Sequence, residues 1–153
     1  MIIKEENVRK IKIKSCGIIL FIILLRDNRL ALSFSSGIIT ILDPNNDYKC
    51  DIQIKEYKEP IYSFCEIVGD NTLAACSWER TLKLFKISKT SYSLLYAITK
   101  IHKNHKCQLL AILNNRILST SEDCIIKIWK GDSPYSDMPI VVLFPKLKSQ
   151  LQK

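Results

Sequence analysis

The feature that most constrains the fold of this chain is an internal repeat. A block of sixteen residues occurs three times without internal gaps, at residues 28–43, 71–86 and 115–130, so the offsets are 43 and 44 residues. Leucine-rich solenoids repeat at about 20–29 residues and helical tetratricopeptide and ankyrin arrays at about 33–34, whereas a period in the low forties is typical of small β-sheets arranged radially. The repeat therefore predicts a row of similar small sheets.

Columns of the aligned block predict two strands joined by a polar turn. The first strand opens at Leu30, Leu73 or Ile117. The apolar positions of the second strand recur in each copy; they are Ile39, Leu82 and Ile126, then Ile41, Leu84 and Ile128, with Leu42, Phe85 and Trp129 at its end. One polar column, with Thr40, Lys83 and Lys127, interrupts them. A strand with a single polar position is covered on most of both faces, as expected when each sheet lies between two neighbours.

Two further runs in each period complete a four-stranded sheet. One precedes each block, at residues 18–25, 61–68 and 107–113, and ends in a turn rich in Asn and Asp. A more variable one lies upstream, at residues 10–14, 51–57 and 93–99, with a final copy at about 139–144. No segment longer than a turn or two has a helical period. We predict an all-β domain over residues 1–153, with units at about 9–43, 44–87 and 88–131 and a trailing outer strand.

Residues 16–25 form an apolar run of ten residues behind a basic stretch, which is the order found in a signal anchor. Ten residues are about half of what a membrane span needs, and no small-residue cleavage site follows. A buried strand is the favoured interpretation, and a signal anchor is the alternative.

The third unit resembles the WD40-repeat family. Residues 109–130, LLAILNNRILSTSEDCIIKIWK, follow the family's order of apolar strand, Ser-x-Ser turn, Asp, alternating strand and terminal Trp. The resemblance implies a partial or incomplete WD40-like β-propeller of about three four-stranded antiparallel blades. It also implies a buried tetrad of hydrogen-bonded side chains formed by His102, Ser119, Asp123 and Trp129. A solvated loop position is the alternative for His102.

The other two units depart from the family pattern. No unit has the Gly-His dipeptide, and unit two has Glu79 where the Asp would stand and no His in its entry loop. Units one and two are therefore expected to rely on apolar packing alone.

Three units are too few for a closed ring, because propellers have about four to eight blades. The apolar faces at the two ends of an open row are expected to need cover. We expect a fragment of a longer propeller, a chain that associates with itself or another chain to complete the ring, or an arc that stands alone.

Charge and cysteine content bear on the binding partners and the cellular compartment of the chain rather than on its fold. The net charge is +8, but the surplus is mostly lysine, which reads nucleic acid less specifically than arginine. The six cysteines are scattered without a Cys-x-x-Cys pair, and several fall in apolar runs where a free thiol packs. We interpret this as a reducing cytoplasmic (cytosolic) or nuclear compartment.

No catalytic or cofactor motif is found. Zinc ligation by His102, His105 and Cys107 lacks a fourth ligand, and a nucleophilic pair of Cys107 with His105 has poor geometry for adjacent positions on one strand end. The chain is expected to be no enzyme and to hold no metal or cofactor.

Binding is the remaining class of function. In the family, the loops at one face of the ring contact partners. Carried over, the candidate residues are Trp78, Glu79, Arg80, Lys103, His105, Lys106 and Glu122, with flanking loop positions at 35–36 and 58–59. Trp78 beside Arg80 has the composition of an interface hot spot, although Trp78 could instead fold over the adjoining blade. We predict an adaptor for a protein or peptide, and a basic module for RNA or anionic membrane lipids is the alternative.

Overall fold

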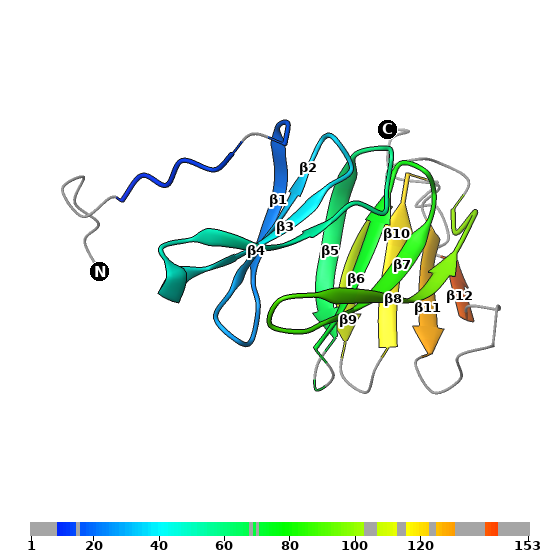
Figure 1. Cartoon of the computed structure of the whole chain (residues 1–153). Helices are drawn as coiled ribbons and strands as arrows, with labels where there is room; N and C mark the ends of the chain where they lie inside the picture. The colour runs from blue at the N-terminus through cyan, green and yellow to red at the C-terminus, as the bar shows by residue number, and fades with distance from the viewer. Residues whose placement is uncertain are drawn as a thin grey trace, which may run out of the picture.

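The computed structural model describes residues 9–14, 16–67, 69, 71–102, 107–112, 116–122, 125–130 and 140–143 (Figure 1). Over these ranges it contains strands, one short 3-10 turn at Pro44–Asn46 and no α-helix. The strands form three antiparallel four-stranded sheets. Sheet 1 contains β1 (Ile19–Leu24), β2 (Leu30–Phe34), β3 (Ile39–Asp43) and β4 (Lys49–Ile54); sheet 2 contains β5 (Ile61–Ile67), β6 (Thr72–Ser77), β7 (Leu82–Ile87) and β8 (Tyr92–Ile98); sheet 3 contains β9 (Cys107–Ile112), β10 (Arg116–Ser121), β11 (Ile125–Lys130) and β12 (Ile140–Leu143). The predicted fold class is confirmed.

Each sheet is a meander offset by one strand from the repeat unit of the sequence. The variable strands predicted upstream of units two and three are β4 and β8, and they pair with β3 and β7 of the preceding sheet. The strand predicted at residues 10–14 is wrong, because residues 9–14 form no strand. Sheet 1 already takes its outer strand from the next unit, so this segment has no strand position to fill.

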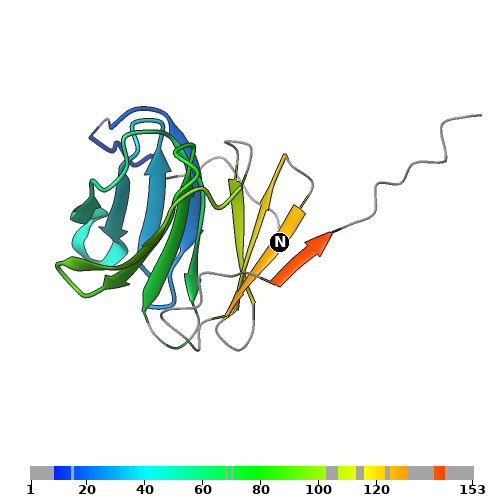
Figure 2. The ribbon, with the colours of Figure 1, turned by 90° about the vertical axis from the view of Figure 1, so that its right-hand side faces the viewer.

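The sheets stand in a row, with sheet 2 between sheets 1 and 3 (Figures 1 and 2). We call the face of a sheet that is turned toward the preceding sheet its upstream face, and the opposite face its downstream face; the upstream face of sheet 1 is the one turned away from sheet 2. One apolar cluster joins the downstream face of sheet 1 to the upstream face of sheet 2, and a second joins sheets 2 and 3. Sheet 2 is therefore covered on both faces, as the columns of the repeat predict.

Tyr57 and Phe85 form the aromatic centre of the first cluster. The ring of Phe85 is fully buried and meets Tyr57 edge-on, with 6.2 Å between ring centroids. The Tyr57 hydroxyl donates to the Ala75 carbonyl at 2.6 Å. Burial raises the pKa of Tyr57 well above its usual value of 10, so the phenol stays protonated and keeps this hydrogen bond.

Strand β1 differs from the expectation of a buried strand for residues 16–25. The strand is present, but Ile19, Ile22 and Leu24 are 47%, 54% and 65% exposed. No sheet lies over the upstream face of sheet 1 in the described part of the chain, so the apolar run is covered on one side only. No helix of membrane-spanning length and apolarity occurs among the residues described.

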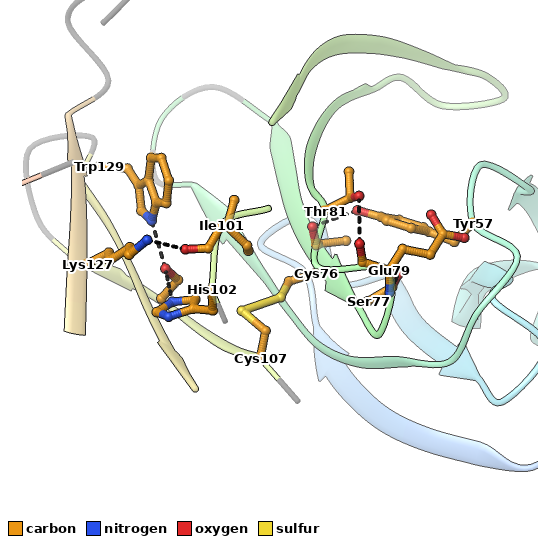
Figure 3. Close-up of a disulfide and its surroundings, with 12 residues drawn as sticks. Tyr57, Cys76, Ser77, Glu79, Thr81, Ile101, His102, Cys107, Lys127 and Trp129 are labelled. Atoms are coloured by element: carbon orange, nitrogen blue, oxygen red, sulfur yellow. Dashed lines mark hydrogen bonds between the residues drawn. A yellow bond between two sulfur atoms is a disulfide. The ribbon is translucent and has the colours of Figure 1, made fainter. Parts of the chain in front are cut away.

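The cysteines differ from the expectation of free thiols. Cys76 of β6 and Cys107 of β9 form a disulfide across the interface of sheets 2 and 3 (Figure 3). Among the described residues, Cys16, Cys50 and Cys65 take no part in this bond. The interpretation of a reducing compartment rested on unbonded cysteines, and the Cys76–Cys107 bond removes part of that basis.

Candidate binding face

Three members of the expected tetrad meet at the upstream face of sheet 3. Ser119 on β10 is fully buried, and its Oγ lies 2.9 Å from His102 Nε2 and accepts from Trp129 Nε1 at 2.8 Å (Figure 3). His102 is 2% exposed, so it is not a solvated loop residue. Asp123 lies outside the described residues. The hydroxyl of Ser119 thus fixes the entry loop of sheet 3 to the end of β11.

Ser119→Ala should lower the free energy of unfolding by about 2 kcal/mol, because it leaves the buried indole N–H and imidazole without their shared partner. Urea denaturation followed by far-UV circular dichroism measures the change. Ser93→Ala, at an exposed position of β8, is the matched control and should change stability by less than about 0.5 kcal/mol. Equal effects of the two variants would contradict the structural role of the Ser119 hydroxyl.

In sheets 2 and 3 the polar column of the repeat binds the segment that enters the sheet. We call the stretch leading into a sheet's first strand its entry segment: residues 9–14 and 16–18 for sheet 1, 55–60 for sheet 2 and 99–102 for sheet 3. Lys83 Nζ donates to the Glu56 carbonyl, and the equivalent Lys127 Nζ donates to the Ile101 carbonyl. Thr40 takes this position in sheet 1, where its buried hydroxyl has no hydrogen-bond partner among the described residues. The sequence shows the column, but not what the lysines bind.

Glu79 ties the entry segment of sheet 2 to the same sheet. Its Oε1 accepts from the backbone N–H groups of Lys58 and Glu59. The expectation that unit two relies on apolar packing alone is therefore wrong: Glu79 and Lys83 together hold the segment with hydrogen bonds where the family pattern has a His and an Asp. Glu79 is engaged within the fold.

Trp78 lies half-buried at the turn between β6 and β7. Its ring packs against Tyr62 of its own sheet, with 5.3 Å between ring centroids, and its backbone N–H donates to the Pro60 carbonyl at 3.0 Å. Trp78 therefore packs on its own sheet with its indole Nε1 buried, and the residue as a whole is only half-buried.

Arg80 and Gly37 occupy equivalent turn positions with left-handed backbone, at φ of 60° and 79°. The Arg80 carbonyl accepts from the N–H of Ile101, in the entry segment of sheet 3. A Cβ on Gly37 would lie 2.6 Å from the Tyr57 carbonyl oxygen, so the first turn and the second entry segment are in close backbone contact. The turns and entry segments of neighbouring sheets thus form one continuous surface, which we call the loop face.

The remaining candidate residues are only partly covered by the structure. Glu122 is exposed in the turn after β10, whereas Lys103, His105 and Lys106 lie outside the described residues. Within the described ranges no three His, Cys, Asp or Glu side chains gather as metal ligands, and Cys107, considered above for zinc, is bonded to Cys76.

Sequence reasoning missed Arg29, which lines a small pocket at the opposite end of the sheets. The residue is 8% exposed. Its guanidinium forms an ion pair with Asp27 at 2.8 Å and donates to the Ser88 and Lys89 carbonyls, between β7 and β8. Burial alone would raise the pKa of Asp27, but the hydrogen bonds and charge of Arg29 outweigh it and hold the pKa below its usual value of 3.8. All the polar contacts of Arg29 are internal, so it joins two sheets and does not mark a ligand site.

Many solved structures share this fold, and three of them illustrate the likeness. The structure of U3-55K has a TM-score of 0.72 at 16% identity, over 86% of this chain and 39% of that one. The crystal structure of the RRP9 WD40 repeats has a TM-score of 0.67 at 17% identity, over 80% of this chain and 36% of that one. The β-propeller domain of Cps50 (Swd1) from Myceliophteria thermophila has a TM-score of 0.66 at 10% identity, over 84% and 42%.

The chain spans about two fifths of the length of these structures. No model of a known protein family matches the sequence, and no curated protein matches it. At these identities the likeness concerns the fold.

Proposed function

We propose that this chain, which has the WD40 β-propeller fold in the form of three blades, is a non-enzymatic scaffold that binds a protein or peptide through its loop face. The observation that carries the proposal is the continuity of that face. Hydrogen bonds join the turn at Trp78 and Arg80 to entry segments on both sides, so aromatic and charged side chains are held on a rigid support. Rigid supports favour binding because little side-chain entropy remains to be lost.

Trp78 is the proposed anchor of the partner, and Arg80 stands beside it. Large aromatic and arginine side chains dominate binding energy at protein interfaces. Glu79 is a positioning residue, because its carboxylate is engaged by the backbone of Lys58 and Glu59. Lys58 and Glu59 themselves are exposed and supply charges of both signs at the rim.

Trp78→Ala should weaken binding of a peptide by about 30-fold, the loss of a hot-spot contact of about 2 kcal/mol. Peptides selected from a displayed random library against the immobilised chain serve as probes, and titration calorimetry gives their affinities. Leu95→Ala, which removes an exposed apolar side chain on the outer strand β8, outside the turns and entry segments of the loop face, is the control and should leave the affinity unchanged. Peptides that bind both variants equally well would show that the face is misassigned.

The alternative of a basic module for RNA or anionic lipids depends on Lys103, His105 and Lys106, and no described contact supports it. Its signature would be binding to RNA or anionic vesicles that falls steeply between about 50 and 200 mM salt.

The proposal also includes a further chain that covers the open end of the row, because β1 exposes apolar side chains there.

A further inference from the structure

The upstream face of sheet 1 is an apolar surface with its inner strand uncovered. Ile19, Ile22 and Leu24 of β1 are 47%, 54% and 65% exposed, and Ile18 just before the strand is 72% exposed. In the ladder, Ile22 stands directly opposite Leu32, which is 2% exposed. Ile19 and Leu24 stand opposite Phe34 and Leu30 in the same ladder, so Ile19, Ile22 and Leu24 belong to the same face as a buried apolar cluster.

Ladder register shows what this face corresponds to in sheet 2. Phe64 stands opposite Ala75 just as Ile22 stands opposite Leu32, and Ile61 begins β5 just as Ile19 begins β1, each ahead of a bulge. Ile61 and Phe64 are 0% and 1% exposed, because the downstream face of sheet 1 lies on them. The upstream face of sheet 1 is thus built like an interface that sheet 2 uses.

The entry segment of sheet 1 packs on the upstream face of its sheet, as the other two entry segments pack on theirs. Ile13 packs on the cluster of Leu32, Phe34 and Leu42, as Tyr57 packs into the cluster between sheets 1 and 2 and Ile101 into the next. Arg9 forms an ion pair with Asp47 and lies over the ring of Tyr48, which fastens the segment. This cluster draws its buried residues from β2 and β3 and none from β1, so the described part of the segment leaves the face over β1 uncovered.

The downstream face of sheet 3 is the complementary half. Leu118 and Ile128 are ladder partners, as are Thr120 and Ile126, and all four are only half-buried. Their equivalents in sheet 2, in the ladder pairs of Ala74 with Leu84 and Cys76 with Leu82, pack against sheet 3. One molecule therefore carries, at opposite ends of its row of sheets, both halves of a sheet-to-sheet interface (Figure 1).

We propose that the occupant of the upstream face of sheet 1 is a second copy of this chain, which packs the downstream face of its sheet 3 onto Ile19, Ile22 and Leu24. The contact is head-to-tail, because the two surfaces are different, and it buries apolar area that is exposed in the single chain. This inference commits the proposed covering chain to a second copy and does not depend on the loop face.

Sedimentation velocity over a concentration series tests the proposal with two interface variants. Ile22→Glu places a charge on the upstream face of sheet 1, and Ile128→Glu places one on the downstream face of sheet 3. The wild-type chain should associate with rising concentration, and each variant alone should raise the dissociation constant roughly tenfold or more. Leu95→Glu, at a leucine 53% exposed on β8, is the control and should associate like the wild type.

Mixing the two variants gives the decisive result. Ile22→Glu keeps an intact sheet 3 face and Ile128→Glu keeps an intact sheet 1 face, so the mixture should form a one-to-one dimer more tightly than either variant associates alone. Ile22→Thr, which keeps a β-branched side chain, is the second variant and should weaken association without loss of the far-UV β-sheet spectrum. A wild-type chain that stays monomeric, a mixture that does not assemble, or an equal loss in Leu95→Glu would overturn the proposal. Peptide binding through Trp78 would be unaffected by any of these outcomes.

Discussion

Phe85→Ala is expected to lower the free energy of unfolding by about 3–5 kcal/mol, the range for truncating a buried Phe in a packed core. Phe85 lies on β7, is 0% exposed and meets the rings of Tyr57 and Tyr92 edge-on, with centroid distances of 6.2 and 6.0 Å. The cavity would open in the cluster that joins sheets 1 and 2, so both sheets should lose stability together. Urea denaturation followed by far-UV circular dichroism measures the change.

Leu94→Ala is the matched control for Phe85→Ala. It removes an apolar side chain that is 44% exposed on the neighbouring strand β8 and should cost less than about 1 kcal/mol. A loss of less than about 1 kcal/mol for Phe85→Ala would contradict a shared core between the two sheets.

Loss of the disulfide is expected to cost about 3–4 kcal/mol, because the cross-link between Cys76 and Cys107 closes a loop of 31 residues and restricts the unfolded chain. Reductant should lower the urea midpoint of the wild-type chain by the corresponding amount. The double variant Cys76→Ala with Cys107→Ala should start from the lower stability and show no further response to reductant. Denaturation curves with and without reductant measure both effects.

Cys65→Ala separates the disulfide from general thiol effects. Cys65, half-buried on β5 and packed against the same interface, is not part of the Cys76–Cys107 bond. The variant should keep the full response to reductant. If the wild-type chain did not respond to reductant, or the double variant responded as strongly, the bond would contribute nothing to stability.

The positions of the strands could be predicted because the repeat shows each one three times. The inner runs predicted at residues 18–25, 61–68 and 107–113 are β1, β5 and β9. Each strand lies inside its predicted run, and its ends are within one residue of the ends of the run. Outer strands of lower apolar content, predicted at 51–57 and 93–99, lie up to three residues earlier, at Lys49–Ile54 and Tyr92–Ile98. Their register depends on pairing with β3 and β7, which a single segment does not reveal.

Contacts between sheets were beyond the reach of the sequence. Cys76 and Cys107 are adjacent only because β6 and β9 meet across an interface, and no local spacing rule covers such a pair. The exposure of β1 has the same origin, because apolar content predicts that a strand can be covered but not that a neighbour is present. For the site, the resemblance placed His102, Ser119 and Trp129 in one network. It did not predict the bonds of Glu79 and Lys83 to the entry segment of sheet 2.

Glu79, Lys83 and Lys127 bond sheets 2 and 3 to their own entry segments. The smallest piece of this chain that contains both partners of these bonds is therefore a sheet together with the entry segment before it. Each lysine reaches the connection that precedes its sheet. A gene duplication or graft that copies residues 55–98 would transfer a sheet together with the backbone its side chains hold. One that copies residues 44–87, the boundaries drawn by sequence similarity, would leave behind β8 and import the outer strand of another sheet. The structural unit, an entry segment with its sheet, is therefore shifted by one strand from the repeat unit of the sequence.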